Sequence, residues 1–117
     1  MVADRQSDFI PDAGDVIWLN FDPQAGREQA GRRPAVVISP KGYNHLSGLA
    51  LVCPVTSKVK GYPFEVRIPG GLAVAGVVLA DQIRCLDWGE RRAALLGRVP
   101  EGVLAEIRAK LVPLLGE

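Results

Sequence analysis

Glycine and proline divide most of this chain into apolar runs that are too short for ordinary helices. The 117 residues include 13 glycines and 9 prolines, and both residue types interrupt regular helix. The runs between them are rich in valine, and bounded runs of this kind favour strands. We expect strands over residues 14–21, 34–39, 49–56, 64–68 and 77–88, the last either continuous or bent. Pro54, inside the third run, indicates an edge strand or a bulge because proline cannot donate to a ladder.

Only the C-terminal residues have the periodicity of a helix. Pro100 suits the first helical position, and apolar residues then recur at three- and four-residue spacing. These apolar residues are Leu104, Ile107, Leu111 and Leu114. The stripe that they form must cover either the strands or a partner chain. Five strands with short connections and one terminal helix predict a mainly β (α+β) fold, built on a small and strongly bent antiparallel sheet.

Length and composition limit the class of protein. The chain fits one domain over residues 1–117, with residues 1–12 as a flexible arm. A hydrophobic content of 48% suggests that part of the apolar surface lies in an oligomer interface. The net charge of +1 neither requires nor excludes a nucleic acid. The N-terminus lacks the apolar segment of a signal peptide, and no apolar run approaches the roughly 20 residues of a membrane helix. We therefore expect a cytoplasmic protein with no membrane association.

The two cysteines, Cys53 and Cys85, are not spaced as metal ligands. They form no CxxC pair and are accompanied by a single histidine, His45, so we expect no metal site. Both cysteines lie in apolar runs and are expected to be buried free thiols, although the sequence leaves a disulfide between them open. His45 follows turn-forming residues and is expected at the surface. One histidine also excludes a two-histidine ribonuclease site within one chain.

A loop rich in arginine, "DPQAGREQAGRR", joins the first two predicted strands. Loops of this length without structure of their own are often functional. Arg27, Arg32 and Arg33 carry guanidinium groups that suit phosphate oxygens, although solvated surface is the more common role of such a loop. Arg33 directly precedes Pro34, which restricts its backbone to extended conformations. A strand should therefore fix the direction of the Arg33 side chain, and a catalytic group requires such positioning.

Thr56 closes the third predicted strand and is a second candidate. Its hydroxyl could donate to a phosphoryl oxygen, while capping of the following turn is at least as common a role for such a residue. Lys58 and Lys60 beside it add local positive charge. No Walker A loop, GxGxxG motif or serine-hydrolase elbow accompanies these residues.

Four ordered stretches carry a family resemblance: "GDVIWLNFDP", "GREQAGRRPAVVISP", "KGYPFEV" and "LADQI". They resemble the MazF (also PemK) family of toxins from toxin–antitoxin pairs, from about Ile10 to Gly116. The resemblance implies an SH3-like barrel of about five antiparallel strands with a C-terminal helix, of the MazF/CcdB/Kid type. It implies a homodimer that cleaves single-stranded messenger RNA at a short specific sequence, without metal or other cofactor. It also implies inhibition by a cognate MazE-like antitoxin.

The resemblance assigns residues as well. The family's catalytic arginine falls on Arg33, its catalytic threonine on Thr56 and its loop glutamate on Glu28. The residues then expected to bind RNA are Asn20, Arg27, Gln29, Ser57, Lys58 and Gln82. Arg27 stands where relatives often carry a serine, and Asn20 where some carry an aspartate. These two departures leave the cleaved sequence open.

The implied reaction uses the 2′-hydroxyl of the RNA as nucleophile and gives a 2′,3′-cyclic phosphate and a 5′-hydroxyl. Arg33 and Thr56 would stabilise charge on the phosphoryl oxygens in the transition state. Arginine keeps its proton in proteins, so the proton goes either to Glu28 or to a water or substrate oxygen. Trp18 and Trp88 could stack on bases, but core or interface packing is the expected role of both.

Two other functions remain compatible with the same fold. A CcdB-like gyrase-binding toxin would have the barrel and no nuclease activity. A plain SH3-like binding module would use the arginine loop only as a docking surface. Arg33 and Thr56 match the nuclease pattern, and the C-terminus "LLGE" lacks the aromatic ending associated with the gyrase poison.

Overall fold

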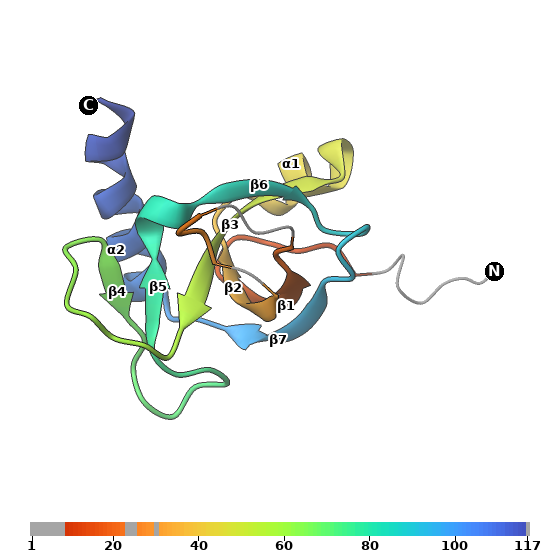
Figure 1. Cartoon of the computed structure of the whole chain (residues 1–117). Helices are drawn as coiled ribbons and strands as arrows, with labels where there is room; N and C mark the ends of the chain where they lie inside the picture. Colours follow the sequence, from red (N-terminus) through yellow and green to blue (C-terminus); the bar gives the residue numbers. More distant parts are fainter. Residues whose placement is uncertain (1–8, 23–25, 30, 117) are drawn as a thin grey trace.

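Seven antiparallel strands form a strongly bent sheet in the computed structural model, which describes residues 9–22, 26–29 and 31–116 (Figure 1). Along the chain the elements are β1 (Asp15–Asn20), β2 (Arg32–Val37), α1 (Lys41–Ser47), β3 (Leu49–Thr56), β4 (Glu65–Arg67), β5 (Val77–Leu79), the 3₁₀ turn η2 (Ala80–Gln82), β6 (Arg84–Asp87), β7 (Ala94–Arg98), α2 (Glu101–Leu111) and the 3₁₀ turn η3 (Val112–Leu115). The neighbouring strands lie in the order β4-β5-β3-β2-β1-β7, and β6 pairs with β3. None of the helices among the described residues is long and apolar enough to cross a membrane.

Strand β3 lies in the interior of the sheet. One side pairs with β2. The other side pairs first with β6, through Leu49 to Val52, and then with β5, through Val55 and Thr56. Pro54 stands where β3 changes from β6 to β5, so its missing N–H removes no ladder bond on that side. Of the two alternatives expected from Pro54, the edge strand is therefore wrong, because β3 has partners on both sides.

The expected number of five strands is also wrong. The run expected over residues 77–88 bends at η2 and forms two strands, β5 and β6. Strand β7 has an exposed or half-buried side chain at every position, so its sequence lacks the alternation that a core-facing strand would show. Helix α1 follows Pro40, contains Gly42 and buries only Asn44, so no apolar stripe predicts that helix.

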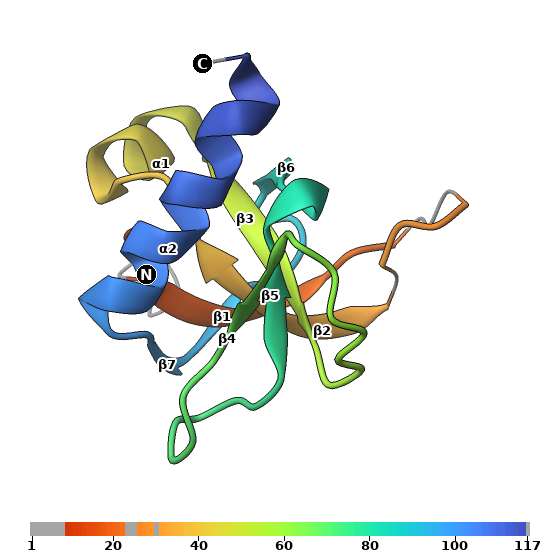
Figure 2. The ribbon, with the colours of Figure 1, turned by 90° about the vertical axis from the view of Figure 1, so that its left-hand side faces the viewer.

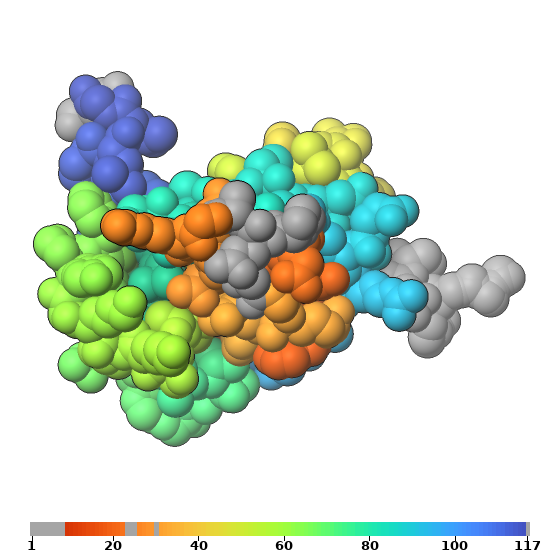
Figure 3. Space-filling view, in the orientation of Figure 1, coloured from red at the N-terminus to blue at the C-terminus, as the bar shows by residue number. Residues whose placement is uncertain are grey.

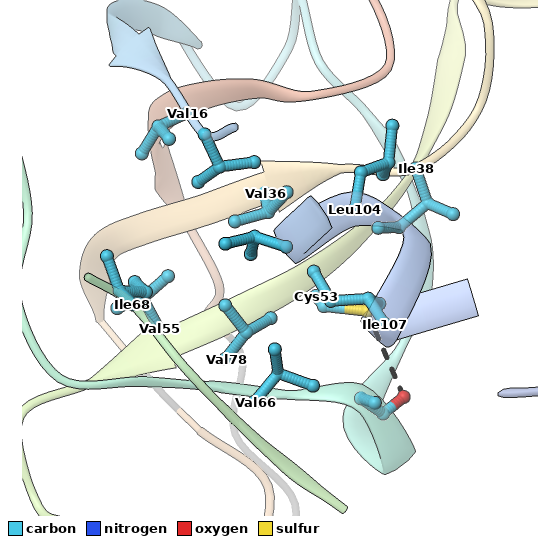
Figure 4. Close-up of a cluster of buried hydrophobic side chains, with 13 residues drawn as sticks. Val16, Val36, Ile38, Cys53, Val55, Val66, Ile68, Val78, Leu104 and Ile107 are labelled. Atoms are coloured by element: carbon cyan, nitrogen blue, oxygen red, sulfur yellow. Dashed lines mark hydrogen bonds between the residues drawn. The ribbon is translucent and has the colours of Figure 1, made fainter. Parts of the chain in front are cut away.

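The central strands are buried on both faces. Alternate residues of β2 enter different clusters, Val36 in one and Ala35 and Val37 in the other. Helix α2 covers the first cluster, where Ile107 is fully buried (Figure 4). In Figure 2 this helix crosses the barrel diagonally. The expected apolar stripe of α2 is confirmed except at Leu114, which is 46% exposed.

The two cysteines have different environments, and both are free. Cys53 lies in the first cluster with its thiol 3.9 Å from the carbonyl oxygen of Ala80. Burial raises the pKa of the Cys53 thiol to about 12, and the nearby charge of Asp81 acts in the same direction. Cys85 is exposed on β6, so the prediction of a buried thiol is wrong for this residue. His45 is exposed on α1, as expected.

The N-terminal segment packs against the barrel from Phe9 onward. Phe9 contacts the second cluster, and Pro11 is buried. A carboxylate oxygen of Asp12 accepts hydrogen bonds from the backbone N–H of Lys41, at 2.9 Å, and of Ala13. Asp12 thereby caps the N-terminus of α1. Residues 9–12 thus belong to the packed domain, and residues 1–8 of the expected arm lie outside the described residues.

Asn44 is fully buried and connects this segment to the sheet. Its amide nitrogen donates to the carbonyl oxygens of Pro11, at 2.8 Å, and of Ser39, at 3.0 Å. Its amide oxygen accepts from the Ser39 hydroxyl, which in turn accepts from the backbone N–H of Leu51. The Trp88 indole donates to the Asn44 carbonyl at 3.1 Å. Helix α1 is therefore held by hydrogen bonds rather than by an apolar face.

A glycine permits the close approach of two backbones at the end of β3. Gly76 has a φ of +113°, and a Cβ atom at this position would lie 2.1 Å from the carbonyl oxygen of Thr56. The next residue, Val77, pairs with Thr56. Only glycine therefore allows β5 to begin where it supports the end of β3.

We predict that Asn44→Ala lowers the free energy of unfolding by about 3 kcal/mol, because it leaves two buried carbonyl groups and a hydroxyl without their partner. Urea denaturation measures the change. His45→Ala, at the exposed neighbouring position on α1, is the matched control and should change the value by less than about 0.5 kcal/mol. Equal effects of the two substitutions would contradict the assigned role of Asn44.

We predict that Gly76→Ala also lowers the free energy of unfolding by about 3 kcal/mol, since it adds backbone strain and a clash with the Thr56 carbonyl. Thermal unfolding measures this effect, and amide chemical shifts at Thr56 and Ser57 should change with it. Gly70→Ala is the control, because a Cβ atom at Gly70 meets nothing within 4 Å and its φ is not in the left-handed region. A Gly76→Ala variant as stable as the control would refute the close approach.

Candidate functional site

A basic groove of about 1380 Å³ lies at the ends of β2 and β3. In Figure 3 the loop that precedes β2, in orange, and the segment that follows β3, in yellow-green, flank a hollow in the molecular face. The basic residues that line the groove are Arg27, Arg32, Arg33, Lys58 and Lys60. Its acidic lining residues are Glu65 and Asp81. The excess of cationic groups suits a polyanion.

Most of the predicted site residues meet in this groove. The predicted residues that line it are Arg27, Gln29, Arg33, Thr56, Ser57, Lys58 and Gln82. Glu28 is exposed and lies between two lining residues, but is not itself in the lining. Asn20 also lies outside the lining. Its side-chain oxygen accepts from the backbone N–H of Asp22, and its carbonyl accepts from the Arg91 guanidinium at 3.1 Å. Asn20 thus forms part of the base of the arginine loop.

Arg33 and Thr56 both line the groove, Arg33 from β2 and Thr56 from the end of β3. Strand β2 pairs with β3 as far as Ala35 and Pro54, which lie two residues from Arg33 and from Thr56. The Arg33 guanidinium donates to the carbonyl oxygen of Val55, at 3.4 Å between Nη1 and the oxygen. A guanidinium and a hydroxyl therefore line the same groove, both carried by strands.

The Thr56 side chain also caps the turn after β3. Its hydroxyl oxygen accepts from the backbone N–H of Lys58 at 3.1 Å, which is the alternative role considered for it. Accepting this bond leaves the hydroxyl proton available to donate. The cap fixes the oxygen, so a phosphoryl oxygen in the groove would meet a donor held in position.

The segment after β3 is held by two residues whose role the sequence did not reveal. The Glu65 carboxylate accepts from the backbone N–H groups of Lys60, at 3.0 Å, and Gly61, at 2.9 Å. The Lys110 ammonium group on α2 donates to the carbonyl oxygens of Pro63 and Glu65. In sequence Glu65 reads only as the polar position of an alternating strand, and Lys110 only as the partner of Glu106 in a helical pair. Their bonds to the backbone depend on tertiary packing.

The two tryptophans differ. Trp18 lines the groove and is 36% exposed, with the Arg32 guanidinium 5.7 Å from the centre of its ring. Trp18 is therefore not a core residue. Trp88 is half-buried against the second cluster, which confirms the expected packing role. Within residues 9–22, 26–29 and 31–116, no group of three or more histidine, cysteine, aspartate or glutamate side chains could hold a metal ion.

Comparison with known proteins agrees with this geometry. Residues 12–115 match the family described as PemK-like, MazF-like toxin of type II toxin–antitoxin systems. The endoribonuclease toxin MazF of Escherichia coli K12 is 48% identical over 110 residues, which cover 94% of this chain and 98% of that protein. The endoribonuclease PemK of Escherichia coli is 36% identical over 115 residues, covering 95% of this chain and 85% of that protein.

Solved structures show the same fold. A crystal structure of MazF from Deinococcus radiodurans superposes with a TM-score of 0.91 at 61% identity, covering 94% of this chain and all of that one. A crystal structure of MazE–MazF from the same organism gives a TM-score of 0.83 at 56% identity, covering 93% of this chain and 98% of that one. The expected SH3-like barrel with a C-terminal helix is confirmed. This chain belongs to the PemK-like, MazF-like toxin family of type II toxin–antitoxin systems.

Proposed function

We propose that this chain is a toxin endoribonuclease that cleaves single-stranded messenger RNA at a short specific sequence. The observation that carries the proposal is that Arg33 and Thr56 line the same basic groove, with the Arg33 guanidinium bonded to the residue before Thr56. Membership of a family whose relatives are named endoribonucleases supports it. The cytoplasm, where messenger RNA is translated, is the compartment that this activity requires.

The nucleophile in the proposed reaction is the 2′-hydroxyl of the RNA. The 2′-oxygen forms a bond to the adjacent phosphorus, and the bond from that phosphorus to the 5′-oxygen of the next nucleotide breaks. The products are a 2′,3′-cyclic phosphate and a 5′-hydroxyl. Negative charge grows on the non-bridging oxygens during the step. Arg33 and the Thr56 hydroxyl, both positioned by strands, stabilise that charge, and no metal or other cofactor takes part.

Two proton transfers complete the reaction. The 2′-hydroxyl loses a proton to a base, and the leaving 5′-oxygen takes a proton from solvent water, to which the base later returns its own. Arg33 serves as an electrostatic group, since arginine keeps its proton. We assign Glu28 as the base, because a carboxylate can accept the proton and the loop holds this residue between two groove-lining residues, Arg27 and Gln29.

Other groove residues bind the chain of the RNA. Arg27 and Lys58 meet phosphates as cations, while Gln29 and Ser57 offer hydrogen bonds to base edges. Exposed single-stranded bases can also stack on Trp18 or Tyr62, which face the same groove. Asn20 holds the base of the loop and acts on the RNA through that loop.

The proposed partners are a second copy of the chain and an antitoxin. Strand β7 lies at the edge of the sheet and exposes Leu95 and Leu96 by 54% and 41%, and an apolar edge of this kind favours an interface. The groove's cationic lining suits the acidic tail of a MazE-like antitoxin, and a relative of this chain crystallises as a MazE–MazF complex.

RNA cleavage in EDTA tests the enzymatic proposal. A long single-stranded RNA should be cut at discrete positions, and 2′-deoxy substitution at a cut position should abolish that cut, because the nucleophile is missing. Arg33→Ala and Thr56→Ala should each lower the rate by about 100- to 1,000-fold, and Thr56→Ser should retain most activity. Gel electrophoresis of end-labelled RNA measures the rates.

Arg67→Ala is the control for these variants, since Arg67 is exposed on β4 and lies outside the groove lining. It should cut like the unaltered protein. Cutting that persists at a deoxy position, or normal cutting by both the Arg33→Ala and the Thr56→Ala variants, would refute the proposed site.

Multi-angle light scattering tests the proposed self-association. The purified chain should have twice the mass of one chain, because the apolar edge at β7 is covered in the dimer. Leu95→Lys with Leu96→Lys should shift the mass towards a monomer, since lysine at an edge strand opposes pairing. A mass of one chain for the unaltered protein at micromolar concentration would contradict the dimer.

A further inference from the structure

We infer that Gln82 is a positioning residue, whose side-chain amide fixes the backbone on both sides of Glu28. The inference rests on the proposed function, in which Glu28 is the base, and adds to it the residue that holds Glu28 in position. The sequence suggested instead that Gln82 binds RNA. Its observed partners are protein backbone groups, and they belong to the residues directly before and after the proposed base.

The two hydrogen bonds have a defined geometry. The backbone N–H of Gln29 donates to Oε1 of Gln82 at 3.0 Å. Nε2 of Gln82 donates to the carbonyl oxygen of Arg27 at 3.5 Å. A backbone N–H can only donate and a carbonyl oxygen can only accept, so one orientation of the amide satisfies both. The first bond spans 53 positions in the sequence and the second spans 55, so the loop is fixed by a distant element.

The element that carries Gln82 is itself firmly placed. Gln82 ends η2, the turn between β5 and β6. Ala80, at the start of this turn, is fully buried. Its backbone N–H donates to the carbonyl oxygen of Phe64 at 3.1 Å, and its own carbonyl oxygen lies 3.9 Å from the Cys53 thiol in the core (Figure 4). Helix α2 packs against the same turn. The amide of Gln82 therefore projects from a fixed support.

The loop needs such a support because it buries little surface of its own. Gly26, Arg27 and Glu28 are exposed, and Gln29 is half-buried. Exposed segments of this kind open readily unless hydrogen bonds hold them. The two bonds use one lone pair and one N–H of the Gln82 amide, so the amide cannot rotate towards an RNA base without breaking both. The arrangement therefore favours positioning over base recognition.

Amide hydrogen exchange tests the clamp without RNA. Gln82→Met keeps the length of the side chain and removes both hydrogen-bonding groups, so the Gln29 amide should exchange about fivefold faster, as expected for one lost hydrogen bond. Gln82→Glu keeps an acceptor, so the Gln29 amide should stay protected in that variant. Asp81→Asn, on the same turn, is the matched control and should leave the rate unchanged. Equal exchange in the unaltered protein and in Gln82→Met would overturn the inference.

RNA cleavage separates positioning from base reading. If Gln82 positions Glu28, Gln82→Met should lower kcat by about fivefold at every cut site, with KM and the cleaved sequence unchanged. If Gln82 reads a base, the preferred sequence should change instead, and that result would overturn the inference.

A double substitution tests whether Gln82 acts through Glu28. Effects on two residues that act as one unit are not additive, so Gln82→Met should lower the cleavage rate little further in a Glu28→Gln background. Additive losses would also overturn the inference. Absence of any cleavage by the unaltered protein would refute the proposed function alone, because hydrogen exchange reports on the clamp independently.

Discussion

The change of partner along β3 is the constraint on which the rest of the structure depends. From Leu49 to Val52 this strand pairs with β6, and at Val55 and Thr56 it pairs with β5. The chain must therefore turn between β5 and β6, and η2 makes that turn. On its other side β3 pairs with β2, and this pairing ends at Ala35 and Pro54, two residues from Arg33 and from Thr56. A single strand thus determines where the proposed catalytic pair lies and where the support for the arginine loop begins.

The sequence predicted those parts of the fold that depend on residues close together in the chain. Strand β3 ends at Thr56, as predicted, because an apolar run bounded by polar residues indicates both the strand and its ends. Arg33 before Pro34 was recognisable because proline restricts its neighbour. Helix α2 was recognisable by its apolar spacing. Each of these signals depends on residues close together in the chain.

The parts that the sequence did not predict depend on residues far apart. Helix α1 is held by hydrogen bonds that the side chains of Asn44 and Asp12 make with distant backbone groups. Such bonds leave no hydrophobic periodicity in the sequence. Strand β7 pairs with β1 while exposing both of its leucines, so its pattern resembles a loop. Cys85 lies in an apolar run but on the outer side of β6. Gly76 is one glycine among 13 in the sequence, and only the position of the Thr56 carbonyl distinguishes it.

Polar residues around the groove have two different roles. Glu65, Lys110 and Gln82 direct their side chains to backbone groups of the two loops that flank the groove. Arg33 and Thr56 stand on strands, so the sheet holds the backbone of both, although the Thr56 hydroxyl also accepts a hydrogen bond from Lys58 in the second loop. In the proposed reaction the strands therefore hold the two groups that stabilise charge on the phosphate, and the loop that Gln82 clamps holds Glu28, the proposed base.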